Sequence, residues 1–393
     1  MTSPTDQRAR GALHRLEARH LLRRAPAITH RRGMHYHLDG EPVVGFCSND
    51  YLGYASATSA SAPPPMDGGL SGAGASRLIC GDLEPHRALE RRLANIAGSE
   101  DAVLFPSGFQ LNVGVLPALL HANDEVFSDR LIHASMIDGL RLAAPTTNIL
   151  PHLQPPDATS RHGERDDDTE PPPLRWWICE SLYSMDATRH DGGDLSAWTA
   201  AGHALYLDGA HDFGLAEGGA GWTHAQDIDA AVYVGTLGKA YGAAGAFVAA
   251  SAHICQWLRN TARSFVFSTG ISPLVAQQLL ARLDEVTGED GDTRRTTLAA
   301  HIARMSELLE LPLDAPIVPL AVGDPSTALS LSQRLRAEGW HVQAIRPPTV
   351  PTGTSRLRLT LSAVHTPAQI EQVAVAIKRV FRDAAQPLRL AQP

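Results

Sequence analysis

Lys239 and Lys378 are the only lysines among the 34 basic residues of this chain. A Schiff base with a carbonyl compound requires a primary amine of adjustable pKa, so a lysine that arginine cannot replace is a candidate nucleophile. Lys239 lies in a glycine-rich segment, residues 235–242, directly after an apolar stretch. A loop of this kind lies at the edge of a sheet where open α/β folds bind ligands. Lys378 lies in an amphipathic helical pattern, and we expect it to be a solvated surface residue.

Acidic and imidazole side chains accompany further apolar stretches. Asp208 and His211 come just after one of these stretches, and His133 comes just before a helical pattern. Taken one at a time, such residues are more often helix caps, structural anchors or partly buried histidines than catalytic groups. Their significance therefore depends on what they form together.

The combination is more specific than its parts, and it suits pyridoxal 5′-phosphate. Lys239 supplies an amine for the cofactor's aldehyde, and a carboxylate such as Asp208 would keep the pyridine nitrogen protonated, so that the ring withdraws electrons. Ser107-Gly108-Phe109 opens a predicted helix, whose first backbone N–H groups can bind a phosphate dianion. Thr236 adds a hydroxyl three residues before the lysine.

Composition excludes several other classes of protein. The formal net charge of −8 leaves no electrostatic footprint for a nucleic-acid partner. No apolar run is long enough to span a membrane, and the N-terminus lacks the apolar core of a secretory signal, so we expect a cytoplasmic protein. The four cysteines contain no C-x-x-C pair and are expected to be buried thiols in a reducing compartment. His30, His35 and His37 form a loose cluster without a carboxylate or cysteine at matching spacing, so we expect a surface patch and no metal site.

The elements that must position these side chains alternate from about residue 85 onward. Strands are predicted over residues 102–105, 125–127, 176–179, 204–207, 231–234 and 246–249. Helices between them are predicted to begin near residues 86, 109 and 133. This alternation predicts an α/β fold with a mostly parallel central sheet covered on both faces.

The pattern changes after a predicted helix at residues 272–286, where helices and strands indicate a smaller α+β domain. We expect residues 1–45 to form an N-terminal helix and strand extension. Residues 46–285 are predicted to form a large domain that binds the cofactor, and residues 286–393 a small C-terminal domain.

Short segments spread over nearly the whole chain carry a combined pattern. They are Ser48–Gly53, Gly72–Leu78, Phe105–Phe109, Asp129–Ser135, Glu180–Asp186, Asp208–His211, Thr236–Lys239 and Phe267–Thr269. Together they resemble the α-oxoamine synthases, a family of fold-type-I pyridoxal-phosphate enzymes, from about Arg23 to the C-terminal helix. The segment Ala344–Pro351, followed by Arg356-Leu-Arg358, resembles the member of this family that acts in biotin synthesis.

The resemblance implies a role for each matching residue. Lys239 would hold the cofactor and later exchange a proton at the amino acid's Cα, His133 would stack on the pyridine ring, and Asp208 would pair with the ring nitrogen. The other cofactor contacts implied are Gly108, Phe109, Ser184, His211 and Thr236. The substrate contacts implied are His133, Asn49, Thr349, Arg358 and Arg23, with Arg24 as the alternative to Arg23. Arg358 is the implied clamp for the amino-acid carboxylate, because a guanidinium binds a carboxylate with two parallel hydrogen bonds.

The implied reaction joins L-alanine to pimeloyl-CoA, or to the pimeloyl thioester of an acyl carrier protein, and releases CO2 and the free thiol carrier. A homodimer is implied in the same way. Two alternatives remain open. One is a sibling synthase that condenses glycine or serine with another acyl-CoA, and the other is a catalytically silent homologue that acts as a binding protein.

Three features depart from the family pattern. Gly209 stands where the family commonly has a second acid, and we expect it to loosen the loop that aims His211. Residues 55–69 are rich in proline and serine, and residues 154–173 carry acidic and proline runs, where the family has regular structure. None of these departures removes a residue with an implied chemical role.

Overall fold

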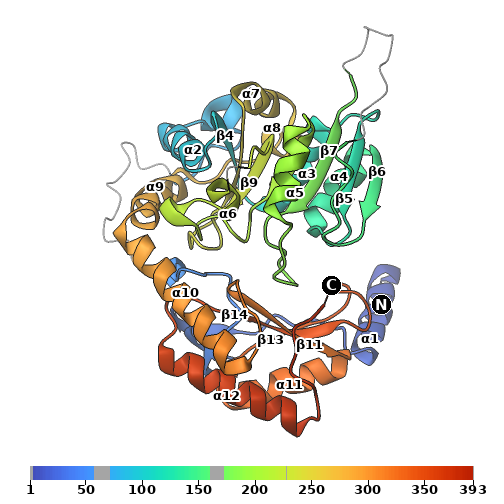
Figure 1. The fold of residues 1–393 in the computed structure, drawn as a ribbon, viewed down its shortest axis with the longest axis vertical. Coiled ribbons are helices and arrows are strands. Elements are labelled where there is room, and N and C mark those ends of the chain that lie inside the picture. The colour runs from blue at the N-terminus through green and yellow to red at the C-terminus, as the bar shows by residue number, and fades with distance from the viewer. Residues whose placement is uncertain (1–2, 57–70, 160–171, 227, 393) are drawn as a thin grey trace. The chain divides into compact units, whose positions relative to one another are not determined.

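The computed structural model describes residues 3–56, 71–159, 172–226 and 228–392 (Figure 1). Spatial contacts divide the chain into two compact units. The smaller unit comprises Met1–Ser56, Ser184–Ala187 and Thr296–Pro393, and the larger unit comprises Ala57–Tyr183 and Thr188–Arg295. The domain boundaries expected after residues 45 and 285 stay a prediction, while the compact units end at residues 56 and 295. Most of the two irregular segments, residues 57–69 and 160–171, lies outside the described residues.

A seven-stranded sheet forms the centre of the larger unit. In spatial order its strands are β4 (Asp101–Phe105), β10 (Ala246–Ala250), β9 (Val232–Thr236), β8 (Ala204–Asp208), β7 (Arg175–Glu180), β5 (Glu125–Asp129) and β6 (Thr146–Leu150). β10 runs antiparallel to both of its neighbours, and the ladders from β9 to β6 are all parallel. The predicted mostly parallel sheet is therefore confirmed.

Helices cover both faces of this sheet, as Figure 1 shows. The helices of the larger unit are α2 (Glu84–Ile96), α3 (Gly108–Leu119), α4 (Ala134–Ala143), α5 (Gly192–Ala200), α6 (Trp222–Ala225), α7 (Ala252–Thr261), α8 (Arg263–Val266) and α9 (Pro273–Thr287), with short turns of helix at Arg77–Gly81 and Glu217–Gly219.

Successive side chains of β7 show which helices lie on which face, because neighbouring residues of a strand point to opposite sides. Trp176 and Ile178 belong to a buried cluster with residues of α3 and α4. Between them in sequence, Trp177 contacts Trp198 of α5, with ring centroids 6.1 Å apart. The continuous apolar sequence of β7 is thus explained by burial on both faces, as is usual for parallel strands.

The smaller unit contains two sheets. One has the order β1 (Ile28–Arg32), β2 (His35–Leu38), β3 (Glu41–Gly45) and β12 (Trp340–His341), and the other has the order β11 (Ile317–Gly323), β14 (Ser355–Thr360) and β13 (Gln343–Ile345). Its helices are α1 (Pro4–Ala18), α11 (Pro325–Ala337) and α12 (Pro367–Asp383), with a helical turn at Tyr54–Ser56, and α10 (Glu289–Leu309) contributes residues to both units.

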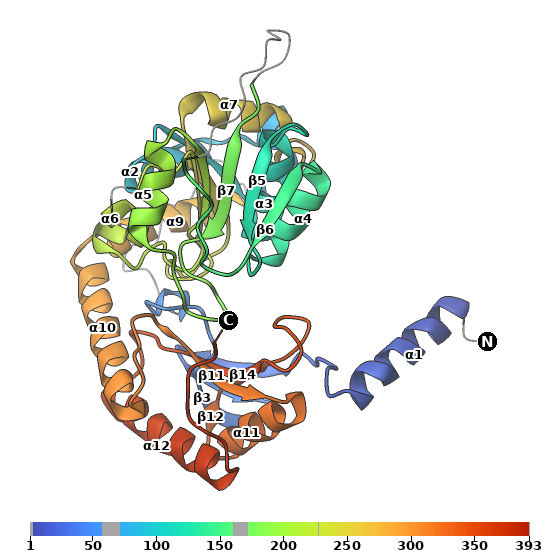
Figure 2. The ribbon, with the colours of Figure 1, turned by 45° about the vertical axis from the view of Figure 1, so that its right-hand side comes forward.

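Two helices of this unit differ in how they are held. α12 begins with a capping box between Thr366 and Gln369 and buries an apolar stripe that includes Ile370, Ile377 and Phe381. α1 buries no residue, and Figure 2 shows it projecting away from the sheets of its own unit.

The helix and strands expected in the N-terminal extension are present as α1, β2 and β3, and the predicted helices and strands after residue 85 are present, with ends shifted by a few residues. No local pattern predicted β1, the edge strand β6, β12, β13, α5 or α7, nor the short helices α6 and α8. Among the described residues, no helix combines the length and the apolar character that crossing a membrane requires.

Candidate active site

Three candidate groups of the larger unit lie at one edge of its sheet. Asp208 is the last residue of β8, Thr236 is the last residue of β9, and Lys239 lies in the loop that follows β9. The carboxyl ends of parallel strands meet at one edge, which is where open α/β sheets bind ligands. The predicted amine, acid and hydroxyl are therefore brought to the same edge.

His133 belongs to the same electrostatic environment. It caps the N-terminus of α4, where its Nδ1 accepts a hydrogen bond from the backbone N–H of Ser135. Although part of its ring is open to solvent, burial of the rest lowers its pKa; the nearby Asp208 raises that pKa and Lys239 lowers it. The imidazole is thus favoured in its neutral form. His211 is also buried in this unit, three residues after Asp208.

The carboxylate of Asp208 is held at both oxygens. Oδ1 accepts the backbone N–H of Ala210 at 2.9 Å, and Oδ2 accepts the side-chain amide of Asn112 at 2.9 Å. Asn112 was not among the predicted site residues. It lies on the apolar helix α3 and is 1% exposed. A buried amide on an apolar helix needs hydrogen-bond partners, and this is the signal that would have found it.

The N-terminus of α3 presents Gly108 and Phe109, the two predicted phosphate contacts. Ser107 caps the helix through its hydroxyl, which accepts the N–H of Gln110. The first N–H groups of a helix have no acceptor within the helix, and they favour an anion. Among the described atoms none lies within 4 Å of where a Cβ at Gly108 would stand. Phe109 lies beside His133, with ring centroids 6.3 Å apart.

Glu180 is a second acid at this edge that the sequence analysis quoted without a role. It ends β7 and is paired in register with Asp208 on β8. Burial is the main reason that the pKa of Glu180 is well above its ordinary value, and the charge of Asp208 raises it further. A backbone N–H of His133 and the charge of Lys239 act in the opposite direction. Glu180 is therefore favoured in its protonated form beside Asp208.

Gly209 does not loosen its loop, contrary to expectation. Its N–H donates to the carbonyl of Val234 at 2.8 Å, and its carbonyl accepts the N–H groups of Asp212 and Phe213. A Cβ at this position would lie 2.1 Å from the hydroxyl of Tyr233. The glycine is required because the phenol of Tyr233 fills the space that a side chain would need.

In the smaller unit, three predicted residues form one cluster. Arg358 on β14 donates through Nε to the carbonyl of Ser184 at 2.6 Å and through Nη1 to Oδ1 of Asn49 at 3.1 Å. Arg358 is 5% exposed, and among the described residues its Nη2 has no hydrogen-bond partner. A buried guanidinium nitrogen without an acceptor is costly, so this position suits an anionic ligand.

Arg23 and Thr349, also predicted substrate contacts, form a second pair in this unit. Nη2 of Arg23 donates to Oγ1 of Thr349 at 2.7 Å. Arg24 is engaged differently, since its Nη2 lies 2.8 Å from a carboxylate oxygen of Glu17 on α1. The geometry therefore favours Arg23 over Arg24 as the residue that acts with Thr349. Lys378 pairs with Glu310 on the surface, as a solvated residue would.

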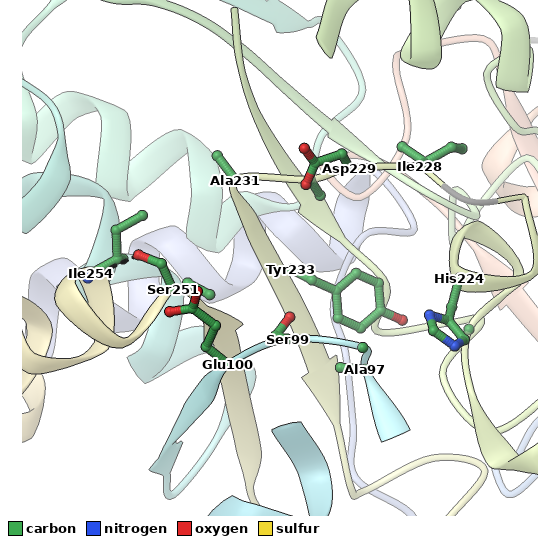
Figure 3. A pocket seen from close by; sticks show the side chains of 14 residues that line it. Ala97, Ser99, Glu100, His224, Ile228, Asp229, Ala231, Tyr233, Ser251 and Ile254 are labelled. Atoms are coloured by element: carbon green, nitrogen blue, oxygen red, sulfur yellow. Dashed lines mark hydrogen bonds between the residues drawn. The ribbon is translucent and has the colours of Figure 1, made fainter. Parts of the chain in front are cut away.

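A hollow of about 610 Å³ in the larger unit contains none of the predicted site residues (Figure 3). Its wall includes Ser99 and Glu100, just before β4, and Tyr233, near the start of β9. It therefore lies at the edge of the sheet opposite to Asp208 and Lys239. Glu100, His224 and Asp229 are spread around it rather than gathered, and the described residues contain no group of three or more side chains that could hold a metal ion.

Comparison with known proteins identifies the family of this chain. The family model for class I and II aminotransferases matches residues 41–377. The 8-amino-7-oxononanoate synthase of Geobacter sulfurreducens is 38% identical over 398 residues, which cover 95% of this chain and 97% of the relative. The enzyme of the same name from Anaeromyxobacter dehalogenans is 39% identical over 398 residues, covering 95% and 97%. The chain belongs to the 8-amino-7-oxononanoate synthase family, within the class I and II aminotransferases.

Solved structures agree on the fold. Serine palmitoyltransferase from Sphingomonas wittichii has a TM-score of 0.83 at 23% identity, covering 98% of this chain and 99% of that one. The 8-amino-7-oxononanoate synthase structure from Francisella tularensis has a TM-score of 0.70 at 23% identity, covering 87% and 99%. The fold is that of the fold-type-I pyridoxal-phosphate enzymes.

Pyridoxal 5′-phosphate is the cofactor of the 8-amino-7-oxononanoate synthase family, and the residues of the larger unit fit it. Lys239 can bind its aldehyde, the hydrogen-bonded carboxylate of Asp208 suits its ring nitrogen, and the free space at Gly108 on the N-terminus of α3 suits its phosphate. When bound, this cofactor stabilises negative charge at the Cα of an amino acid by withdrawing electrons into its ring.

Proposed function

We propose that this chain catalyses the decarboxylative condensation of L-alanine with a pimeloyl thioester, forming 8-amino-7-oxononanoate, CO2 and the free thiol carrier in biotin biosynthesis. Membership of the family supports the reaction class. The observation that supports binding of the amino-acid substrate is the buried Nη2 of Arg358, which has no hydrogen-bond partner among the described residues.

Arg358 would bind the carboxylate of alanine. Its Nε and Nη1 are already committed to Ser184 and Asn49, so the guanidinium plane is fixed before substrate arrives. The remaining Nη2 can donate to a new partner, and a carboxylate satisfies a buried guanidinium better than water does. Because no rotation is needed on binding, little side-chain entropy is lost.

The larger unit would supply the proton chemistry. We assign Lys239, whose amine would hold the cofactor, the transfer of a proton from and to the Cα of the amino acid. Asp208 would hold the proton on the ring nitrogen of the cofactor. His133, neutral and partly open to solvent, would cover the ring and face the substrate. Gly108, Phe109, Thr236 and His211 of this unit stay proposed cofactor contacts, as does Ser184 of the smaller unit.

Arg23 and Thr349 would contact the acyl substrate. They form one hydrogen-bonded pair in the smaller unit, and Arg23 is exposed, so the pair is open to a substrate that arrives from solvent. The adjacent Arg24 is a matched control because it carries the same charge but is paired with Glu17. Whether the thiol carrier is CoA or an acyl carrier protein is decided by the assay below.

We also propose a homodimer, which exposed apolar side chains of the larger unit support. Ile79 is 83% exposed, Phe267 is 74% exposed and Phe109 is 50% exposed. The segments that carry Ile79 and Phe267 lie together, since Ser76 and Thr269 pair in an isolated bridge, and exposed apolar side chains that are grouped favour an interface. The double substitution Ile79→Glu and Phe267→Glu should shift the mass measured by light scattering from that of a dimer to that of a monomer. A monomeric wild-type chain would refute the dimer.

A cytoplasmic location is part of the same proposal. All four cysteines are free, and Cys179 and Cys255 are buried. Proteins of reducing compartments commonly keep their thiols in this state.

The experiment is a product assay with the purified chain, pyridoxal 5′-phosphate, one amino acid and one thioester. We expect 8-amino-7-oxononanoate from L-alanine with pimeloyl-CoA or pimeloyl-acyl carrier protein, and much less product from glycine or L-serine. Lys239→Ala should fold and lose turnover. Arg23→Ala should raise the KM for the thioester, whereas Arg24→Ala should not. Preference for glycine or serine would instead identify a sibling synthase, and no turnover with any pair would refute the proposal.

A further inference from the structure

Asn112 joins the two groups that the proposed function places on the cofactor ring. Its Nδ2 donates to Oδ2 of Asp208 at 2.9 Å and to Oγ of Ser135 at 3.0 Å. Its Oδ1 accepts the hydroxyl of Tyr206 at 2.6 Å. Ser135 lies in turn 2.7 Å, Oγ to Nδ1, from His133. One amide on α3 therefore contacts β8 twice, through Asp208 and Tyr206, and contacts the start of α4 through Ser135. Figure 1 shows α3 and α4 within the same layer of helices.

The direction of each hydrogen bond in this network follows from the donors that are available. If the amide were turned over, its oxygen would face the carboxylate of Asp208, and two acceptors would repel. The phenol of Tyr206 therefore donates to Oδ1, and both hydrogens of Nδ2 are used on Asp208 and Ser135. Since Asn112, Tyr206 and Ser135 are all at most 1% exposed, water cannot substitute for any of these partners without a buried group losing its bond.

The serine then determines the state of the histidine. Oγ of Ser135 receives a hydrogen from Asn112, so its own hydrogen is available for Nδ1 of His133. The backbone N–H of Ser135 points to the same Nδ1 at 3.3 Å. With two donors aimed at it, Nδ1 is an acceptor, and the ring carries its hydrogen on Nε2.

The charged groups around His133 are compatible with this neutral ring. Asp208 on β8 favours a positive imidazole, whereas burial and Lys239, in the loop after β9, oppose it. Glu180 at the end of β7 accepts the backbone N–H of His133 and is itself favoured in the protonated form by burial. The charges from β7, β8 and the loop after β9 therefore do not decide the tautomer of His133. The hydrogen bonds at its Nδ1 decide it.

We propose that Asn112 is a positioning residue that sets the orientation of the Asp208 carboxylate and the Nε2–H tautomer of His133 together. This inference rests on the proposed function, in which Asp208 and His133 act on the cofactor ring. Asn112 touches neither cofactor nor substrate in this proposal. It acts through its two neighbours, so that the group at the ring nitrogen and the group covering the ring are oriented by the same amide.

Three variants of the cofactor-loaded protein test this. Asn112→Asp keeps the shape of the side chain but replaces the donor with an acceptor that faces Asp208. Ser135→Ala removes only the hydroxyl that links Asn112 to Nδ1 of His133. Ser128→Ala is the matched control, because Ser128 is also buried and its hydroxyl donates to a backbone carbonyl on β5. Circular dichroism and the urea unfolding midpoint establish that each variant is folded.

The readouts are the dissociation constant of pyridoxal 5′-phosphate and the pH at which the absorption band of the bound cofactor changes. Neither readout needs an acyl donor. We expect Asn112→Asp to weaken cofactor binding by about ten-fold or more, because a hydrogen bond to a buried charge is replaced by a repulsion. Ser135→Ala should leave the dissociation constant within about two-fold of wild type and shift the absorption transition. Ser128→Ala should change neither quantity.

The outcomes distinguish a failure of this inference from a failure of the proposed function. If wild type binds the cofactor and Ser135→Ala matches Ser128→Ala in both readouts, the inference is overturned and the proposed function stands. That comparison remains decisive if Asn112→Asp does not fold, since Ser135→Ala removes a single hydroxyl. If wild type binds no cofactor, the proposed function and this inference are refuted together.

Discussion

Replacing Asp212 with asparagine should change the stability of this protein in opposite directions at acidic and neutral pH. Asp212 is 1% exposed. Its Oδ1 accepts the hydroxyl of Tyr233 at 3.0 Å, and its Oδ2 accepts the backbone N–H of Trp222 at 3.1 Å. Burial raises its pKa to about 6, although hydrogen bonds from Ser181 and Tyr233 act in the opposite direction.

The sign and size of the effect follow from linkage. The folded protein binds the proton of Asp212 more tightly than the unfolded chain does, so the free energy of unfolding falls as pH rises from 3.8 to about 6 and the loss is complete above that window. At 1.36 kcal/mol per pH unit, the loss amounts to about 3 kcal/mol at neutral pH. Asparagine does not ionise and avoids this loss. It replaces one acceptor oxygen with an NH2 group, which costs about 1 to 2 kcal/mol at every pH.

The assay is urea unfolding of the cofactor-free protein, followed by tryptophan fluorescence at pH 4 and pH 7.5. Omitting the cofactor removes its contribution to the folded state. We expect Asp212→Asn to be less stable than wild type at pH 4 and more stable at pH 7.5. Asp229→Asn, which alters an exposed carboxyl of the same unit, should show no such reversal. A difference between Asp212→Asn and wild type that is the same at both pH values would refute the reasoning from burial.

Three further predictions concern packing, a buried ion pair and substrate binding. Gly209→Ala should destabilise the protein by about 1 to 3 kcal/mol in urea unfolding, because its Cβ would lie 2.1 Å from the hydroxyl of Tyr233; an unchanged midpoint would contradict this. Glu90→Gln should cost about 1 to 3 kcal/mol, since it removes the charge of the buried partner that lies 2.5 Å from Arg77, while Asp82 still pairs with that guanidinium; a loss well below about 1 kcal/mol in thermal unfolding would argue against it. Arg358→Lys should raise the KM for alanine about ten-fold while the affinity for cofactor stays the same, because an ammonium lacks the planar fork of the guanidinium; equal KM values would show that this arginine does not bind substrate.

Local patterns in the sequence predicted most of the larger unit. The helix predicted to begin near residue 86 is α2, and its buried residues include His86, Leu89 and Leu93. The uniformly apolar strands predicted burial on both sides. β6 was missed because its residues are mostly exposed or half-buried, so no apolar pattern marks it. β12 is only two residues long and pairs with β3 from a distant part of the chain, a contact that no local pattern contains.

The residues of the candidate site also fall into those that a local sequence pattern predicts and those that it does not. Lys239 and Asp208 were predicted because a reactive side chain follows an apolar strand, which is a local signal. Asn112 gave no such signal, since it is a single amide in an apolar helix. The hydrogen bond between Arg358 and the carbonyl of Ser184 joins residues 174 positions apart. A resemblance could suggest that both residues act in one enzyme, but only the fold shows that one holds the other.

The acids at the edge of the sheet raise a physical problem, because Glu180 and Asp208 stand side by side on neighbouring strands. Two charged carboxylates in a buried position repel strongly, so protonation of one of them relieves the repulsion. Glu180 is favoured in the protonated form by burial and by its neighbour. Asp208 receives the amide of Asn112 and the N–H of Ala210, donors that suit a carboxylate. The network around Asn112 thus does more than orient a side chain: it supplies a hydrogen-bond donor to the carboxylate that would lie opposite the ring nitrogen of the cofactor.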